Sequence, residues 1–264
     1  MKIIDAHTHI FPDKIAEKVS KSIGGFYDMH YCAPASVTNL LADGKAAGIS
    51  HFLVCSAAVT PDQTETITDF MAQVIQNHDC MTALASIHPD YQNFEEELDR
   101  AISLGLRGVK LHPDFQKFDI DDEKLFPLYR AIAKRGLPIL MHMGDDRYEA
   151  SSPAKLAAVM RKIPDLTVIA AHFGGYRRWK EAHDVLEPSD RLWFDTSSST
   201  MFISRDYALS MFDKFGIDRF FFGTDFPIWN ATGELERVKA FGLSEKEYEM
   251  YFAGNFERLF GPKQ

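Results

Sequence analysis

The sequence lacks the features that define several broad classes of protein. No stretch approaches the roughly 18 uninterrupted apolar residues of a membrane-spanning helix, so we expect no membrane insertion. The 29 basic residues are outnumbered by 38 acidic ones, and the resulting formal net charge of -9 argues against general binding to nucleic acid or to anionic membranes. Neither a G-x-G-x-x-G motif after the first predicted strand nor a P-loop occurs, so both common nucleotide-binding fingerprints are absent.

Cysteine is scarce as well. Cys32, Cys55 and Cys80 are odd in number and widely separated, and no C-x-x-C pair exists. Reduced thiols are therefore expected, with Cys55 in the core because it lies in an apolar strand. The chain passes from Met1 directly into a predicted strand, with no charged leader and apolar signal core, which predicts a cytoplasmic location.

What the sequence does contain is a series of short apolar runs. Residues 137–141 (LPILM) and 167–171 (TVIAA) are nearly continuous runs, which is typical of parallel strands that are covered on both faces. We predict strands near residues 2–7, 50–55, 82–87, 107–112, 137–142, 167–172, 191–195 and 219–223.

Helices are predicted between these strands. Pro153 suits the first turn of one helix with Ser152 as its N-cap, Gly136 suits the C-terminal end of another, and residues 244–247 (SEKE) match a capping box. The predicted helices lie near residues 12–22, 94–104 and 122–135, and begin near residues 151 and 244.

The alternation of eight strands with helices predicts one domain, residues 1–264, with the α/β fold of a (β/α)8 TIM barrel. An open doubly wound sheet is the competing fold, and the missing nucleotide fingerprints argue against it. About 40 residues separate the first two strands, so the barrel is expected to be slightly distorted, with an extended first crossover. Residues 24–31, with two glycines beside aromatic side chains, form either a lid over the barrel mouth or a surface loop in this interpretation.

Titratable side chains are concentrated at the predicted strand ends. His7 and His9 share one face of the first strand, because alternate side chains of a strand point to the same side, and two such imidazoles are good zinc ligands. TIM-barrel enzymes build their sites at the carboxyl ends of the strands. The residues predicted there are His7, His9, His88, Lys110, His112, His142, His172, Asp195 and Asp225.

Several of these segments together resemble the metal-dependent amidohydrolase superfamily. The histidines of the first, fifth and sixth strands, and Asp225 after the eighth, occur in the order typical of that superfamily. More narrowly, residues 108–113 (GVKLHP), 171–175 (AHFGG), 223–227 (GTDFP) and 254–260 (GNFERLF) resemble the branch of aminocarboxymuconate-semialdehyde decarboxylase and related small barrel hydrolases. The resemblance covers essentially the whole chain.

This resemblance implies roles for the site residues. A divalent ion, usually zinc, would lower the pKa of a bound water from about 15.7 to about 7. Asp225 would both touch the ion and take a proton from the water, and His172 would be the acid or base beside it. The ligands implied for the ion are His7, His9, His142 and Asp225, and the candidates for binding the substrate are His112, Arg147, Arg177 and His30.

Lys110 leaves the number of metal ions open. In binuclear members of the superfamily, a carbamylated lysine on the fourth strand bridges two ions, and His142 and His172 bind the second ion. In the narrower branch, one ion is usual, and a lysine occurs in this segment without bridging. We expect one ion and an unmodified Lys110, and the alternative is a second metal bound by Lys110 and His172.

The implied function is hydrolysis of a small-molecule amide, ester or lactone by a metal-activated water. A non-oxidative, metal-dependent decarboxylase of a small carboxylic acid would use the same ligands and is the alternative, although the shortness of the chain favours hydrolysis. A barrel that binds a metal without turnover is disfavoured, because a structural zinc site needs no additional base such as His172. The expected partner is a small-molecule substrate, and a homodimer is plausible for such a barrel.

Overall fold

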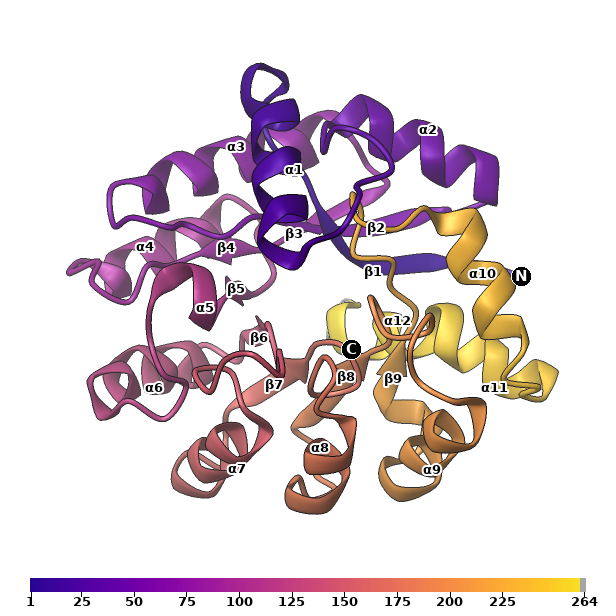
Figure 1. Ribbon diagram of the computed structural model, residues 1–264. Coiled ribbons are helices and arrows are strands. Elements are labelled where there is room, and N and C mark those ends of the chain that lie inside the picture. The colour runs from indigo at the N-terminus through magenta and orange to yellow at the C-terminus, as the bar shows by residue number, and fades with distance from the viewer. Residues whose placement is uncertain (262–264) are drawn as a thin grey trace.

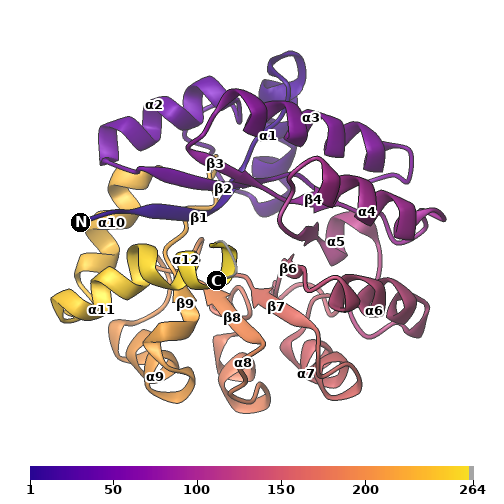
Figure 2. The same ribbon diagram turned by 180° about the vertical axis from the view of Figure 1, so that it is seen from behind.

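A ring of parallel strands forms the centre of the molecule, and helices surround the ring (Figures 1 and 2). The computed structural model describes residues 1–261. Successive strands pair in sequence order, as β1-β2-β3 and as β4-β5-β6-β7-β8-β9. This arrangement is the predicted TIM barrel. The strands are β1 (Ile4–His9), β2 (His51–Cys55), β3 (Met81–Ala83), β4 (Ala85–Ser86), β5 (Val109–Leu111), β6 (Pro138–Met141), β7 (Thr167–Ala170), β8 (Leu192–Asp195) and β9 (Phe220–Phe221).

The third predicted strand, near residues 82–87, is interrupted. β3 pairs with β2, whereas β4 pairs with β5. The change of partner occurs at Leu84, whose N–H donates to the Val54 carbonyl (3.1 Å), while the next N–H, of Ala85, donates to the Gly108 carbonyl (2.9 Å). The expected distortion of the barrel therefore has one of its origins here.

Hydrogen bonds also connect the segment after the last strand to the first strand. The Ala6 N–H donates to the Phe222 carbonyl (2.9 Å), and the Asp225 N–H donates to the His7 carbonyl (2.8 Å). The buried Asp5 carboxylate accepts from the N–H (3.0 Å) and the hydroxyl (2.7 Å) of Thr224. These bonds hold the segment after β9 beside β1, so Asp225 lies next to His7 although the two are far apart in the sequence.

Helices connect successive strands, and the predicted helix ends are largely confirmed. Gly136 follows the end of α6 with φ of 64°, and Ser244 forms the predicted capping box with Glu247. Ser152 is the N-cap of α7, but its hydroxyl makes no capping hydrogen bond. No helix within residues 1–261 is long and apolar enough to cross a membrane. The α-helices are α1 (Asp13–Tyr27), α2 (Val37–Ala47), α3 (Gln63–Asn77), α4 (Phe94–Ser103), α5 (Pro113–Gln116), α6 (Phe126–Lys134), α7 (Pro153–Lys162), α8 (Trp179–Val185), α9 (Arg205–Phe215), α10 (Ala231–Lys239), α11 (Glu245–Glu249) and α12 (Asn255–Phe260).

The first crossover is more ordered than the sequence predicted. The helix expected near residues 12–22 continues as α1 through two glycines to Tyr27. Gly24 is needed here, because a Cβ atom at this position would lie 2.6 Å from the Met29 carbonyl oxygen. The chain then turns through Asp28, which has φ of 53°. Tyr27 and Met29 consequently reach the pocket at the carboxyl ends of the strands, as expected of a lid and not of a remote surface loop.

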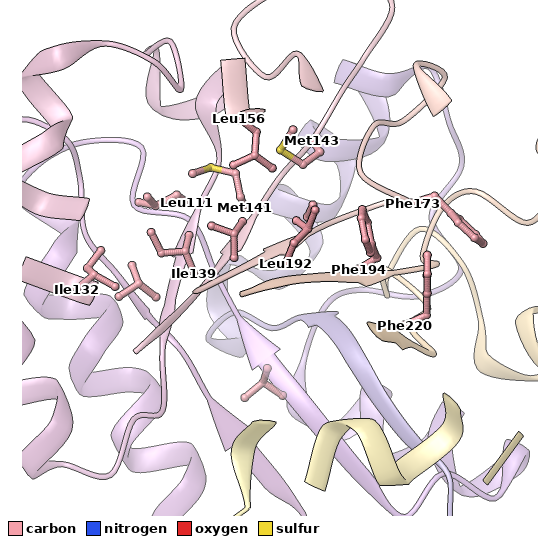
Figure 3. Close-up of a cluster of buried hydrophobic side chains, with 14 of the residues drawn as sticks. Leu111, Ile132, Ile139, Met141, Met143, Leu156, Phe173, Leu192, Phe194 and Phe220 are labelled. Carbon is pink, nitrogen blue, oxygen red and sulfur yellow. The ribbon is translucent and has the colours of Figure 1, made fainter. Parts of the chain in front are cut away.

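Apolar side chains on both faces of the strands hold the barrel and the helices together. Ile139 and Met141 of β6 belong to the cluster between strands and helices, with Ile132 of α6 (Figure 3). Leu140 points the other way and belongs to the cluster inside the barrel. Burial on both faces explains the continuous apolar runs by which the strands were predicted. The same alternation directs His142, which follows β6, towards the inside of the barrel.

The two phenylalanines at positions 194 and 202 give a matched test of this packing. Phe194 is fully buried against Phe215 and Phe220, with ring centroids 4.7 and 4.8 Å away, whereas Phe202 is 37% exposed. Phe194→Ala is expected to lower the free energy of unfolding by about 3–5 kcal/mol, and Phe202→Ala by roughly 1 kcal/mol or less. Urea denaturation followed by tryptophan fluorescence measures both losses. Equal losses for the two variants would contradict the packing described.

Candidate active site

The carboxyl ends of the strands bring most of the predicted site residues into one cluster. Six of them are almost completely buried, and the side chains of His9 and Asp225 are only 13% and 15% exposed. Side chains from β1, β5, β6 and β7 and from the segment after β9 meet there, as the TIM-barrel prediction requires. The six buried residues are His7, Lys110, His112, His142, His172 and Asp195.

A bulge in β1 aims the first two histidines. Ile4 and Ala6 belong to the cluster inside the barrel, so strict alternation would turn His7 outward. The register between β1 and β2 shifts between Asp5 and Thr8, which redirects the side chains that follow. As a result, the Nε2 atoms of His7 and His9 both face the Oδ1 atom of Asp225, at 3.5 and 3.2 Å.

These three groups match the geometry of a divalent-metal site. Ligand nitrogen and oxygen atoms lie about 2.0–2.2 Å from zinc, so neighbouring corners of a tetrahedral site are about 3.3 Å apart. The distances of 3.2 and 3.5 Å to Asp225 Oδ1 lie on either side of that value. His7, His9 and Asp225 therefore fit as three ligands of one ion.

Asp195 fixes the orientation of His7, a role that the sequence analysis did not assign. The Nδ1–H of His7 donates to Asp195 Oδ2 (2.9 Å), which leaves the Nε2 lone pair on the side of Asp225 and Lys110. Ser197 donates to the other carboxylate oxygen of Asp195 (2.5 Å). Burial raises the pKa of Asp195, but the adjacent His7 outweighs it and lowers the pKa to about 2. A carboxylate behind a ligating histidine is a common support for a metal site. The sequence did contain a signal for this role. Asp195 lies two residues after Trp193, whose side chain faces the barrel interior, and alternate residues of a strand share one face.

A directed chain of hydrogen bonds joins the other histidines and sets the tautomer of each. At one end the Phe115 N–H donates to His112 Nδ1 (3.4 Å), so the His112 Nε2–H donates to the Tyr27 hydroxyl (3.1 Å). Tyr27 then donates to His142 Nε2 (3.4 Å), and the His142 Nδ1–H donates to His172 Nε2 (3.1 Å). At the other end the His172 Nδ1–H donates to the Ser197 carbonyl (3.0 Å).

This series of hydrogen bonds separates His142 from the other implied metal ligands. Its Nε2 lone pair faces the Tyr27 hydroxyl, while its Nδ1 faces His172 and not Asp225. The His172 ring lies between the two groups, stacked on His7 with centroids 5.2 Å apart. The structure thus brings together three of the four implied ligands directly, and the fourth belongs to the adjoining histidine chain.

Tyr27 and Met29 roof the pocket beside these histidines. The cavity volume is about 10 Å³, which is about the space that one water molecule needs. The pocket therefore has room for little more than one water molecule in this conformation. The lining residues are Tyr27, Met29, His142, His172, Tyr176, Ser198, Asp225 and Ile228.

Lys110 lies against the metal-facing side of His7. Its buried Nζ atom is 3.1 Å from His7 Nε2, the nitrogen that also faces Asp225. This position agrees with the prediction that Lys110 lies at the carboxyl end of its strand. Whether Lys110 stays unmodified beside one ion or bridges two ions stays a prediction.

The residues predicted to bind substrate occupy different places. His112 is buried in the histidine chain, whereas His30 is exposed and is not a lining residue of the pocket. Arg147 braces the roof, because it pairs with Asp145 (2.7 Å) and donates to the Phe26 carbonyl (2.9 Å). Arg177 lies 4.2 Å above the Phe202 ring and donates to the hydroxyl of the lining residue Tyr176 (3.1 Å).

Burial and nearby charges set the protonation of the cluster. Burial lowers the pKa of His7 to about 4 and holds that of His142 well below its usual value, so both rings are neutral at pH 7 and able to bind metal. Burial opposes ionisation of Asp225, but His7 and His9 outweigh it and hold the carboxyl pKa well below its usual value. Burial also lowers the pKa of His9, yet Cys55 and Asp225 raise it to about 9. A cation bound beside Asp225 would replace that proton.

Comparison with known proteins identifies the family. A sequence model of the family described as amidohydrolase matches residues 4–261. This chain belongs to that amidohydrolase family.

Solved structures of other proteins share the fold along its whole length. One is 5-carboxyvanillate decarboxylase from Sphingomonas paucimobilis, at 15% identity, a TM-score of 0.77 and coverage of 99% of both chains. Another is a candidate 2-pyrone-4,6-dicarboxylic acid hydrolase from Pseudomonas putida, at 18% identity, a TM-score of 0.72, and coverage of 98% of this chain and 97% of that one.

A third structure contains a metal. It is 5-carboxyvanillate decarboxylase from Novosphingobium aromaticivorans in complex with manganese and 4-hydroxy-3-methoxy-5-nitrobenzoic acid, at 15% identity and a TM-score of 0.75, with coverage of 99% of this chain and 96% of that one. In this chain, several groups of buried or nearly buried residues have ligand atoms close enough for a divalent ion, among them His7 with His9 and Cys55.

The different positions of His142 and His172 lead to a test. His142→Asn is expected to reduce metal content sharply, since it removes one of four implied ligands, whereas His172→Asn is expected to keep the metal. Metal analysis of the purified variants, with His183→Asn away from the site as a control, measures the difference. If His172→Asn also strips the metal, the binuclear alternative with Lys110 is favoured instead.

Proposed function

We propose that this chain is a metal-dependent hydrolase that acts on an amide, ester or lactone bond of a small molecule. The observation that carries the proposal is the shared contact of Asp225 Oδ1 with the Nε2 atoms of His7 and His9, at 3.5 and 3.2 Å. This contact lies at the wall of a pocket that His172 also lines. Ligands for an ion therefore occur beside a separate acid or base.

His7, His9, His142 and Asp225 would hold one divalent ion. Three nitrogen donors and one oxygen donor suit zinc, and the manganese in the decarboxylase structure makes that ion a second candidate. When bound, the ion acts as a Lewis acid and lowers the pKa of a water molecule. For His142 to take part, its Nε2 atom must exchange the Tyr27 hydroxyl for the ion.

The other groups of the pocket handle protons and charge. Asp225, which is ionised, accepts a proton from the attacking water. His172 is held by the Ser197 carbonyl at Nδ1. Its Nε2 atom, which accepts from the His142 Nδ1–H in this conformation, would receive a proton or return it to the leaving group once that hydrogen bond is broken. Arg177, at the rim beside Tyr176, is the candidate partner for a carboxylate of the substrate.

Non-oxidative decarboxylation of a small carboxylic acid is the second candidate. It is favoured by the match to 5-carboxyvanillate decarboxylase over 99% of both chains. Because of that coverage, the length of this chain no longer favours hydrolysis. The same residues would serve, with a proton delivered to the carbon atom that loses carbon dioxide. The cytoplasmic location and the homodimer stay predictions from the sequence.

Purified protein is expected to contain about one equivalent of divalent metal per chain, because one set of four ligands is implied. Inductively coupled plasma mass spectrometry after gel filtration measures it. Removal of the metal by a chelator should abolish turnover, and added zinc or manganese should restore it. An active preparation that holds no metal and resists chelators would contradict the proposal.

Isotope labelling separates the two candidate reactions. With a panel of lactones, esters and aromatic carboxylic acids, hydrolysis in water enriched in oxygen-18 places one heavy oxygen atom in the product. Decarboxylation in deuterium oxide instead places deuterium on the carbon that carried the carboxylate. Mass spectrometry of the products, with enzyme-free samples as controls, is expected to show the oxygen label. Deuterium on carbon without the oxygen label would favour the decarboxylase.

A further inference from the structure

Ser198, which follows β8, makes a short contact with the carboxylate of the candidate metal site. Its hydroxyl donates to Asp225 Oδ2 at 2.6 Å, and both residues line the pocket. Both also adopt left-handed backbone conformations, with φ of 52° and 63°. Such conformations are strained in residues other than glycine and are concentrated at functional sites. The backbone is therefore strained at both Ser198 and Asp225, the two residues whose side chains are in contact.

Trp229 determines the direction of the Ser198 hydroxyl. The indole Nε1–H donates to Ser198 Oγ at 3.1 Å. An indole nitrogen is a donor only, so the serine hydrogen cannot point back at it. The hydroxyl is thus an acceptor towards Trp229 and a donor towards Asp225.

The Trp229 ring itself packs against a partly buried ion pair of α10. The Arg237 guanidinium lies 5.3 Å from the ring centroid and donates to Glu234 Oε1 (2.5 Å), whose residue is 1% exposed. Arg237 also donates to the Thr200 hydroxyl (3.0 Å), which in turn donates to Glu234 (2.5 Å). The support for Ser198 therefore extends from the pocket to a helix of the outer layer.

We infer that Ser198, oriented by Trp229, is a positioning residue for Asp225. It occupies the Oδ2 atom, so that only Oδ1 is presented to His7, His9 and the ion. This assignment rests on the proposed metal-dependent function. Groups that hold a metal ligand from behind typically contribute about 10–100-fold to metal affinity.

Calorimetric titration of the metal-free protein with Zn²⁺ tests this role. Ser198→Ala is expected to bind zinc on the order of 10–100-fold more weakly than the natural protein. Trp229→Phe, which keeps an aromatic ring under Arg237 but loses the N–H donor, is expected to show a smaller loss. Ser199→Ala is the matched control, since Ser199 is also buried but its hydroxyl donates to the Ser197 carbonyl. Its affinity for zinc should be unchanged.

The visible absorption spectrum of the Co²⁺-loaded protein is a second measurement, because it changes only if the ligands of the ion change. A purely structural role of Ser198 would leave this spectrum unaltered. Ser198→Ala should alter the bands, because the freed Oδ2 atom can join the ion, whereas Ser199→Ala should not. Natural affinity and spectrum in Ser198→Ala, or equal losses in Ser198→Ala and Ser199→Ala, would overturn the inference. If the natural protein binds neither ion, the proposed function itself is wrong, and the positioning role falls with it.

Discussion

The buried, ionised carboxylate of Asp225 is the constraint on which the candidate site depends. A charge removed from water is costly unless it is paired and hydrogen-bonded. Here both oxygen atoms accept a hydrogen bond, one from the Nε2–H of His9 and the other from the Ser198 hydroxyl. Each of these partners needs its own support, which explains why the irregular parts of the barrel are found around this group. The bulge in β1, the Asp195 carboxylate and the left-handed turns all orient its neighbours.

The barrel could be predicted from the sequence because its signals are local. Strands covered on both faces must be apolar along their whole length, and residues 137–141 and 167–171 show this directly. The break between β3 and β4 could not be predicted, because it depends on which neighbouring carbonyl each N–H of the strand meets. The end of α1 was placed too early for a similar reason. Gly24 looks like a helix breaker in the sequence, but in the fold it allows close contact with Met29.

The sequence could predict those residues of the candidate site that lie at the ends of predicted strands. His7, His9 and Asp225 lie together as expected, since the carboxyl ends of all strands face one side of a barrel. Ser198 was missed, because nothing local to it indicates that it reaches Asp225. The lid prediction included Tyr27, but it did not give the contacts of Tyr27 with His112 and His142. The same limit applies to the reaction. One fold and one ligand set can support hydrolysis or decarboxylation, and the choice depends on pocket geometry.

The position of Tyr27 has a kinetic consequence. Its hydroxyl lies between His112 and His142, and α1 carries it into the pocket as part of a regular helix. In the proposed reaction, a substrate that displaces this hydroxyl from the histidines would require an outward and an inward movement of the first crossover. Arg147 ties that crossover to the opposite rim through the Phe26 carbonyl. When such an opening is slower than the bond-breaking step, it sets the turnover number, and substrates of unequal reactivity are consumed at similar maximal rates.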